Sequence, residues 1–446
     1  MKKLLTLVIA ALMAVTCCFG LTACGGGDVV NPYDGIVKVD SVSELKVGLI
    51  CLHDNNSTYD KNFIDAFEVA CEEAGISESN MLIKTNIPES IACYEAAAEL
   101  VDQGCDYIFA NSFGHEPYIL KAANEFPQVQ FSHATGTTAH TEERGNFHNA
   151  FASIYEGRYL AGVAAGMKLA EMVAADATIA NTDGEIQIGY VGAFPYAEVI
   201  SGYTSWFLGV RFALEGITGG TYTPVMEVQY TGSWYDETAE KSAAENLITR
   251  GAKLISQHAD SMGAPTACET AGVPNVSYNG STAAACPDTF IVSSRIDWAP
   301  YYTYCFEQLL AGEEIALDWT GTIETGSVVL TDLGSAAAEG TEEVLVAIKD
   351  MLTGESADGA IIKIFDLDAF TVNGEKLADD TKADVDTDAA FTPDTEVIKS
   401  ATISVYDPVE DRPMGKTIYY YAESEFRSAP YFDKIIDGIT ILTDAE

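Results

Sequence analysis

The stretch Val228 to Ser261 reads VQYTGSWYDETAEKSAAENLITRGAKLISQHADS, and its pattern decides the fold class. Asp236 stands where a helix N-cap belongs, and Gly251 stands where a helix would stop. Between them, apolar residues recur on one helical face, at Ala239, Ala243, Ala244, Leu247 and Ile248. Short strand-like segments flank this helix. The stretch therefore predicts one strand-helix-strand unit of a doubly wound α/β fold with parallel sheets.

In an open parallel sheet, ligands bind outside the carboxyl ends of the strands. The loops that follow these two strands are polar and aromatic, and they carry Gly232, Ser233, Trp234, His258 and Asp260. We expect these residues to face a ligand.

The same pattern occurs earlier in the chain. Residues 98–114, AELVDQGCDYIFANSFG, match residues 245–261 as helix, glycine, short apolar strand and polar loop, so that Phe113 aligns with Asp260. Any two strand-helix units share some likeness, which is the alternative explanation. We interpret the repeat as two similarly wound lobes whose loops face a shared cleft.

The 446-residue chain is long enough for two or three domains, and its formal net charge of -43 excludes nucleic acid as a natural partner. The first residues, MKKLLTLVIAALMAVTCCFGLTAC, are typical of an export signal that is too short to span a membrane comfortably. LTAC resembles a bacterial lipobox. We predict a signal peptide at residues 1–23, lipidation of Cys24, and a flexible tether over residues 24–44.

Seven cysteines follow Cys24, and they form no CxxC pair. Most lie in apolar segments, which favours small buried side chains over disulfides or metal ligands. The acidic run DVDTD, with Asp384, Asp386 and Asp388, lacks the glycine and closing glutamate of a calcium loop. No metal and no cofactor is predicted.

The predicted first lobe covers residues 45–150 and is completed by about 290–318. The predicted second lobe covers residues 151–289 and is completed by about 319–446. Residues 366–397 within it are acidic and poor in large apolar side chains, which is typical of an insertion or a mobile loop. Residues 147–171 run from a connection into a helix that is rich in glycine and alanine, which allows close packing.

Several segments together resemble the basic membrane protein (BMP), PnrA-like substrate-binding lipoproteins of ABC transporters. They are the signal and lipobox, SFGHEPYILKAANEFPQVQFSHATG, YEGRYLAGVAAGMK, IGYVGAFPYAEVISGY, GSWYDETAEK, ISQHADS and DWAPYY. The resemblance covers about residues 20–335. It implies a two-lobed, type I periplasmic-binding-protein fold that closes about its crossing segments on a purine nucleoside or purine base.

The resemblance also implies site residues. Tyr59 and Asp60 fall in the first ligand turn of that family, Tyr203 falls where nucleoside binders have a stacking phenylalanine, and Gly232 matches a backbone contact. Thr135 and Asn279 replace two aspartates of the nucleoside binders, the second of which binds ribose, and a lysine is replaced near Asp297. HATG, SWYD, QHADS and WAPYY are closer to a subgroup linked with purine bases.

Physical reasoning from the residues leads to the same kind of site. A flat heteroaromatic ring gains about 0.5 to 1.5 kcal/mol beyond burial from each aromatic contact, here from Tyr59 or Phe194 on one side and Trp234 or Tyr203 on the other. Carboxylates and amides can read the edge of the ring. The predicted ligand-binding residues are Asn56, Tyr59, Asp60, Phe113, Thr135, Phe194, Tyr203, Gly232, Trp234, Asp260, Asn279 and Asp297.

These features predict a lipid-anchored, monomeric receptor at the extracytoplasmic face of the cell membrane that delivers a purine to an ABC permease. Two alternatives stay open. An exported nucleoside-processing enzyme would need acid-base groups, but no nucleophile or metal-binding spacing accompanies the aspartates. A ligand sensor would dock on a signalling receptor instead of a permease.

Overall fold

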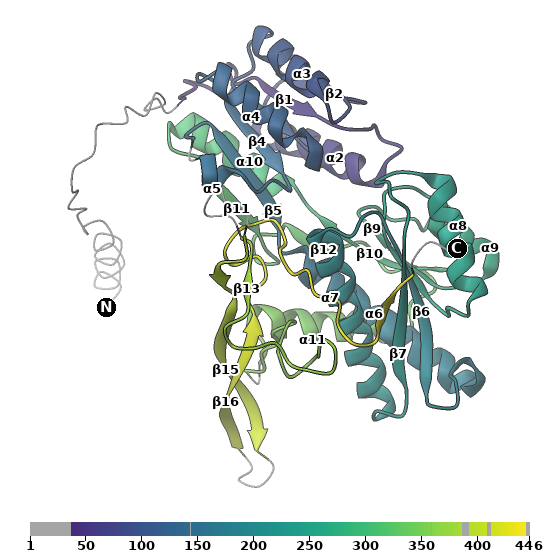
Figure 1. The fold of residues 1–446 in the computed structure, drawn as a ribbon. Helices are drawn as coiled ribbons and strands as arrows, with labels where there is room; N and C mark the ends of the chain where they lie inside the picture. The colour runs from purple at the N-terminus through teal and green to yellow at the C-terminus, as the bar shows by residue number, and fades with distance from the viewer. Residues whose placement is uncertain (1–36, 143, 358, 386–391, 408–411, 443–446) are drawn as a thin grey trace, which may run out of the picture. The chain divides into compact units, whose positions relative to one another are not determined.

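One parallel sheet and one mostly parallel sheet, each with helices against both faces, form the fold (Figure 1). The computed structural model describes residues 37–142, 144–357, 359–385, 392–407 and 412–442. The predicted signal peptide, Cys24, most of the tether, and Asp386 and Asp388 lie outside these ranges. None of the helices in the described ranges combines the length and apolar character needed to cross a membrane.

The first sheet has the strand order β11-β5-β4-β3-β1-β2, and all its strands are parallel. Its strands are β1 (Val47–Ile50), β2 (Met81–Lys84), β3 (Tyr107–Ala110), β4 (Gln130–Ala134), β5 (Phe147–Ala152) and β11 (Asp318–Gly321). Its helices are α2 (Thr58–Ala74), α3 (Ile91–Asp102), α4 (Glu116–Glu125), α5 (Ala139–Glu142) and α10 (Ala299–Ala311), with short 3-10 turns η1 (Glu78–Asn80) and η2 (Phe113–His115).

Alternation along each strand explains why helices cover both faces of this sheet. Tyr107 and Phe109 of β3 join the cluster that includes α2 and α10, whereas Ile108 and Ala110 join the cluster with α3 and α4. Successive side chains of a strand point to opposite faces, so a strand buried on both sides is apolar throughout.

The second sheet has the order β12-β10-β9-β8-β6-β7-β17, with β12 antiparallel to β10. Its strands are β6 (Glu185–Gly192), β7 (Thr223–Tyr230), β8 (Ile255–His258), β9 (Asn275–Tyr278), β10 (Phe290–Ile296), β12 (Val328–Leu330) and β17 (Ile439–Ile441). The elements around it are α6 (Ile154–Ala175), η3 (Ala177–Ile179), α7 (Ala197–Thr218), α8 (Glu237–Thr249), α9 (Gly263–Ala271) and α11 (Thr341–Thr353).

The predicted repeat corresponds to two equivalent places in the two sheets. Helix α3 leads into β3, which lies between β1 and β4, and α8 leads into β8, which lies between β6 and β9. The Asp236 side chain caps α8 by accepting from the Ala239 backbone N–H at 2.9 Å. The strand-helix-strand unit and the α/β class are confirmed.

The position of β10 differs from the predicted lobe boundary. The prediction places residues 290–318 in the first lobe, but β10 pairs with β9 in the second sheet. Only the helix α10 that follows it packs on α2, through Phe63 and Trp298 among others. The next strand, β11, returns to the first sheet beside β5. The β10 sequence, FIVSSRI, is compatible with a strand of either sheet, so it does not decide between them.

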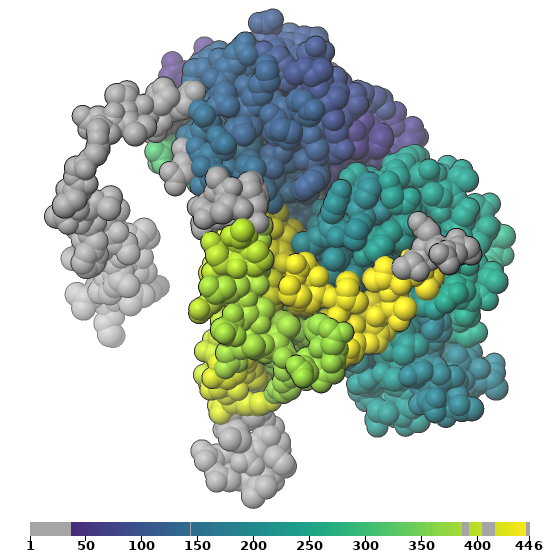
Figure 2. All heavy atoms as spheres, in the orientation of Figure 1, coloured from purple at the N-terminus to yellow at the C-terminus, as the bar shows by residue number. Residues whose placement is uncertain are grey.

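The C-terminal part of the chain is tied to both sheets. The Ser428 N–H donates to the Asp318 carboxylate of β11 at 2.8 Å, and β17 pairs in parallel with β7, with Ile439 opposite Met226. In Figure 2 this yellow segment lies against the teal residues of the second sheet. The preceding region forms β13 (Lys382–Ala383), β14 (Thr395–Glu396), β15 (Ile398–Asp407) and β16 (Arg412–Tyr421).

The acidic stretch 366–397, predicted as an insertion or a mobile loop, is anchored to the fold by a few buried side chains, whereas most side chains of residues 373–380 are exposed. Leu367 and Phe370 are buried, and the Phe370 ring lies 5.8 Å from that of Phe432. The low apolar content of the stretch as a whole does not reveal that these few side chains are buried. All seven described cysteines are buried and free of disulfides, as predicted.

Helices α6 and α7 cross at close range because both carry glycine at the contact. A methyl group at Gly162 would collide with the Trp206 carbonyl oxygen, and one at Gly209 would collide with the Tyr159 carbonyl oxygen. The predicted close packing of the small-residue helix is confirmed. These helices cover the second sheet beneath the cavity described below.

We expect Gly162→Ala to lower the free energy of unfolding by about 2 kcal/mol, because the added methyl group forces the two helices apart. Gly216→Ala is the matched control, since a methyl group at Gly216 in α7 meets nothing within 4 Å. That change should raise stability by about 0.5–1 kcal/mol through helix propensity. Chemical denaturation of both variants measures the difference, and equal effects would contradict the close contact.

Candidate functional site

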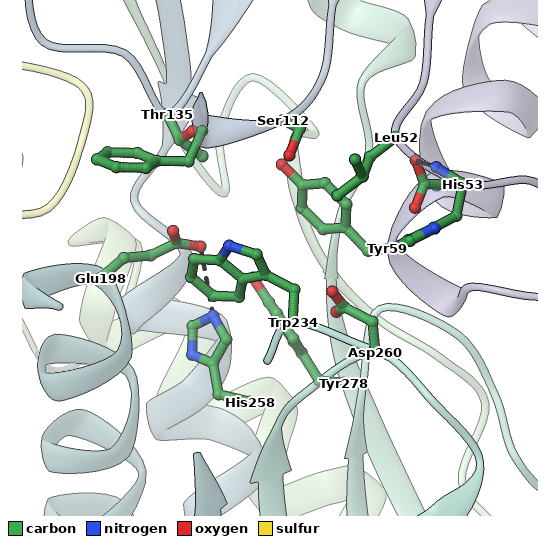
Figure 3. Close-up of a pocket in the computed structure, with 12 residues that line it drawn as sticks. Leu52, His53, Tyr59, Ser112, Thr135, Glu198, Trp234, His258, Asp260 and Tyr278 are labelled. Atoms are coloured by element: carbon green, nitrogen blue, oxygen red, sulfur yellow. Dashed lines mark hydrogen bonds and ion pairs between the residues drawn. The ribbon is translucent and has the colours of Figure 1, made fainter. Parts of the chain in front are cut away.

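A cavity lies where the carboxyl ends of the two sheets meet (Figure 3). Its lining comes from loops and helix N-termini that follow β1, β3 and β4 of the first sheet and β6, β7, β8 and β9 of the second. The lining residues are Leu52, His53, Tyr59, Asp60, Ser112, Phe113, Thr135, Glu198, Trp234, His258, Asp260 and Tyr278.

Hydrogen bonds within the first lobe fix its side of the cavity. The Ser57 hydroxyl caps α2 by accepting from the Asp60 N–H at 3.1 Å. The Asp60 carboxylate accepts from the His53 N–H at 3.0 Å and from Asn111 Nδ2 at 2.8 Å. Tyr59 Oη donates to the Asn111 carbonyl oxygen at 2.7 Å. Asp60 and Tyr59 are therefore held in place by the protein itself.

Aromatic side chains form much of the second-lobe side. The Trp234 ring lies 5.2 Å from Phe194 in an edge-to-face arrangement and 6.0 Å from Tyr196. In Figure 3, Trp234 lies between Tyr59 and the pair formed by Glu198 and His258. Aromatic faces of this kind accept flat rings.

A polar edge borders the aromatic surface. His258 Nε2 lies 3.3 Å from Glu198 Oε1. Burial, together with the Arg158 charge, lowers the pKa of His258 to about 4, so this imidazole is neutral at pH 7 and donates to the Glu198 carboxylate. Burial, reinforced by Glu240, Asp60 and Glu198, raises the pKa of Asp260 well above its usual value.

Direct contacts join the two sides. Both the N–H and the hydroxyl of Thr58 donate to the Asp260 carbonyl oxygen at 3.1 Å. The Phe113 ring lies 5.5 Å from Tyr196. The cavity is thus enclosed between residues that follow the strands of the two sheets.

Two residues have an unusual backbone at equivalent places. Thr135 follows β4 with φ 64°, and Asn279 follows β9 with φ 63°. A left-handed conformation is a clear outlier for a β-branched residue such as threonine, and such strain clusters at ligand sites.

Half of the predicted ligand-binding residues lie around this cavity. They are Tyr59, Asp60, Phe113, Thr135, Trp234 and Asp260. Phe194 packs against Trp234, Gly232 donates its N–H to the Ala193 carbonyl oxygen at 2.9 Å, and Tyr203 is fully buried with its hydroxyl 3.3 Å from that of Tyr230.

The structure places Asn56, Asn279 and Asp297 around a separate open space, which Thr58 and Arg295 also line. The Thr58–Asp260 hydrogen bonds join a residue of this space to a residue of the cavity. Residues that follow neighbouring strands can thus line two different spaces. Their position after a strand does not predict which of the two spaces they line.

Sequence reasoning missed five lining residues: Leu52, His53, Ser112, Glu198 and Tyr278. Tyr278 ends β9, and Leu52, His53 and Ser112 lie two or three residues beyond the ends of β1 and β3, so the rule that located Trp234 could have found them. Glu198 gave no such signal, because an acidic residue in the first turn of α7 is also typical of ordinary helix N-termini.

The arrangement suits binding of a small flat molecule with polar edges. Aromatic faces and carboxyl groups converge on one enclosed volume, and the described residues contain no group of three His, Cys, Asp or Glu side chains placed to hold a metal. A cavity between two similarly wound sheets joined by crossings is typical of two-lobed solute-binding proteins.

The chain belongs to the family described as ABC transporter substrate-binding protein PnrA-like (Bmp), whose model matches residues 49–352. The resemblance noted in the sequence is thereby confirmed. This is a family of substrate-binding proteins and not of enzymes, which agrees with the prediction that the chain is not an enzyme.

Two curated proteins are similar in sequence. A putative ABC transporter glucose-binding protein of Haloferax volcanii is 29% identical over 286 residues, covering 64% of this chain and 67% of that protein. A purine-binding protein of Brucella abortus is 30% identical over 217 residues, covering 49% of this chain and 55% of that protein. The chain thus spans about half the length of the Brucella protein.

Solved structures share the fold. A solute-binding protein of an ABC transporter system from Conexibacter woesei has a TM-score of 0.53 at 22% identity, covering 69% of this chain and 96% of that chain. One from Aeropyrum pernix has a TM-score of 0.54 at 18% identity, covering 71% and 82%. The type I periplasmic-binding-protein fold is confirmed.

Proposed function

We propose that this protein is the extracytoplasmic substrate-binding component of an ABC importer and that it takes up a purine in the cavity between its lobes. The observation that carries the proposal is the convergence of Tyr59 and Trp234 with Asp60, Asp260 and Glu198 on one enclosed volume. Aromatic faces bury the ring, and carboxyl groups accept hydrogen bonds from ring and amino N–H groups.

A free base fits this site better than a nucleoside. The position that binds ribose in the nucleoside binders is Asn279 here, and Asn279 lines the separate space beyond the Thr58–Asp260 contact. The Thr58–Asp260 contact thus separates the residue at the ribose position from the cavity. This separation favours an unsubstituted purine.

The remaining parts of the proposal rest on the sequence and the family. The LTAC motif supports lipid attachment at Cys24. The family supports a monomeric receptor that delivers its ligand to an ABC permease at the cell membrane. Two lobes joined by crossing segments support a mechanism in which the lobes close on the ligand about those segments. The name of the Haloferax relative makes a hexose the second candidate ligand, since aromatic faces and carboxylates also bind sugars.

The protein without residues 1–24 should show a clear thermal shift with adenine or hypoxanthine and a smaller one with guanosine or inosine. Ligand at 100 times its Kd adds about 2.7 kcal/mol of stability. Glucose is the comparison ligand. A shift with glucose alone would replace the purine by a hexose, and no shift with any base or nucleoside would remove the purine claim.

A further inference from the structure

Arg158 is a buried cation behind the second-lobe wall of the cavity. It is 1% exposed in α6, and its Nη1 donates to the Gln257 carbonyl oxygen at 2.9 Å. Within the described part of the chain, its Nε and Nη2 have no hydrogen-bond partner. A buried guanidinium without a direct carboxylate partner is costly, so a compensating interaction must act nearby.

One such interaction is with the cavity wall itself. The Arg158 guanidinium carbon lies 3.3 Å from the centroid of the Tyr278 ring, and Tyr278 lines the cavity. The His258 ring lies 4.7 Å from the same tyrosine. Gly202 leaves room for this group, because a methyl there would lie 3.0 Å from His258 Nδ1 and 3.6 Å from Arg158 Nε. Arg158 thus holds Tyr278 by a cation-π contact.

The second interaction is with the carboxyl groups that face the cavity. Asp60, Glu198 and Asp260 line it, and Glu240 lies behind Asp260, where it accepts from the Ser261 N–H. Arg158 is the cation whose charge acts on this group, since it helps to lower the pKa of His258 and counters the rise in the pKa of Asp260. The basic side chains of the lining itself are His53 and His258.

We propose that Arg158 is a specificity-determining positioning residue of the binding site. Its guanidinium fixes Tyr278 against the cavity, and its charge offsets the carboxyl groups around the ligand, so that the cavity selects an uncharged ring over a cationic one. This inference rests on the proposed function, and it predicts that loss of the Arg158 charge changes which ligands are preferred.

The test compares adenine with 1-methyladenine in its positively charged form by isothermal titration. The wild-type protein should favour adenine. In Arg158→Met, the ratio of the two Kd values should shift by about tenfold toward the cation, because one positive charge near the ligand is gone. Arg158→Lys keeps the charge and should keep the ratio within about threefold while weakening both ligands.

A purely structural role gives a different result. Loss of packing would weaken both ligands alike, so an unchanged ratio in Arg158→Met overturns the proposal. Glu198→Gln is an independent variant that removes a negative charge and should shift the ratio toward adenine; if Arg158→Met does not fold, an unchanged ratio in Glu198→Gln also overturns it. Failure of the wild-type protein to bind adenine would instead remove the purine function.

Discussion

Trp234→Ala is expected to weaken purine binding about 30-fold while leaving the folded protein intact. Trp234 is only partly buried, and it presents its ring to the cavity opposite Tyr59. Loss of one base-aromatic stacking partner costs about 1–3 kcal/mol, and 2 kcal/mol corresponds to about 30-fold. Isothermal titration with the base that gives the largest thermal shift measures this loss.

Trp206→Ala is the matched control, since it removes the same side chain from the same lobe. Trp206 is fully buried in α7, with its ring 5.8 Å from Tyr190 and not in the cavity lining. We expect this variant to lose about 3–5 kcal/mol of stability through cavity formation, with little change in the affinity of the protein that remains folded. Equal affinity in the two variants would reverse the assignment of Trp234 to the site.

The strand-end rule explains which site residues the sequence could reveal. Trp234 and Asp260 follow β7 and β8 in loops that are too polar and aromatic for simple turns, and both line the cavity. The repeated unit indicated that a second lobe would supply the opposite side, and Phe113, aligned with Asp260, lines it too. The local sequence pattern and the geometry of parallel sheets are sufficient to predict that these residues lie at the site.

Other features depend on contacts between distant parts of the chain. Arg158 lies in a helix whose glycine and alanine residues indicate only close helix packing. The fold places it against Tyr278, which is 120 positions away in the sequence. Tyr203 was expected at the ligand, but the helix turns it into the core beside Tyr190. The sequence of strand β10, FIVSSRI, is compatible with either sheet and does not specify that it pairs with β9.

Glu156 is a partly buried residue whose carboxyl oxygen Oε2 is inaccessible to solvent, and no sequence pattern singled it out. It lies in the first turn of α6, close to the crossing that follows β11, and its Oε2 has no hydrogen-bond partner within the described part of the chain. Burial, together with the nearby charge of Glu324, raises the pKa of Glu156 to about 8. The folded protein therefore binds this proton more tightly than the unfolded chain does.

Glu156→Gln is expected to raise the free energy of unfolding by about 4 kcal/mol at pH 9 and to change it little at pH 4. Between about pH 4.5 and pH 8 the unfolded wild-type chain releases the proton while the folded protein keeps it, so wild-type stability falls as the pH rises through this window. Glutamine keeps the shape of the protonated acid and cannot ionise. Calorimetric Tm values at both pH values measure the effect. Glu171→Gln, on the exposed face of the same helix, is the control, and its effect on Tm should be the same at pH 4 and at pH 9. An equal gain from Glu156→Gln at pH 4 and pH 9 would show that burial of the charge is not the cause.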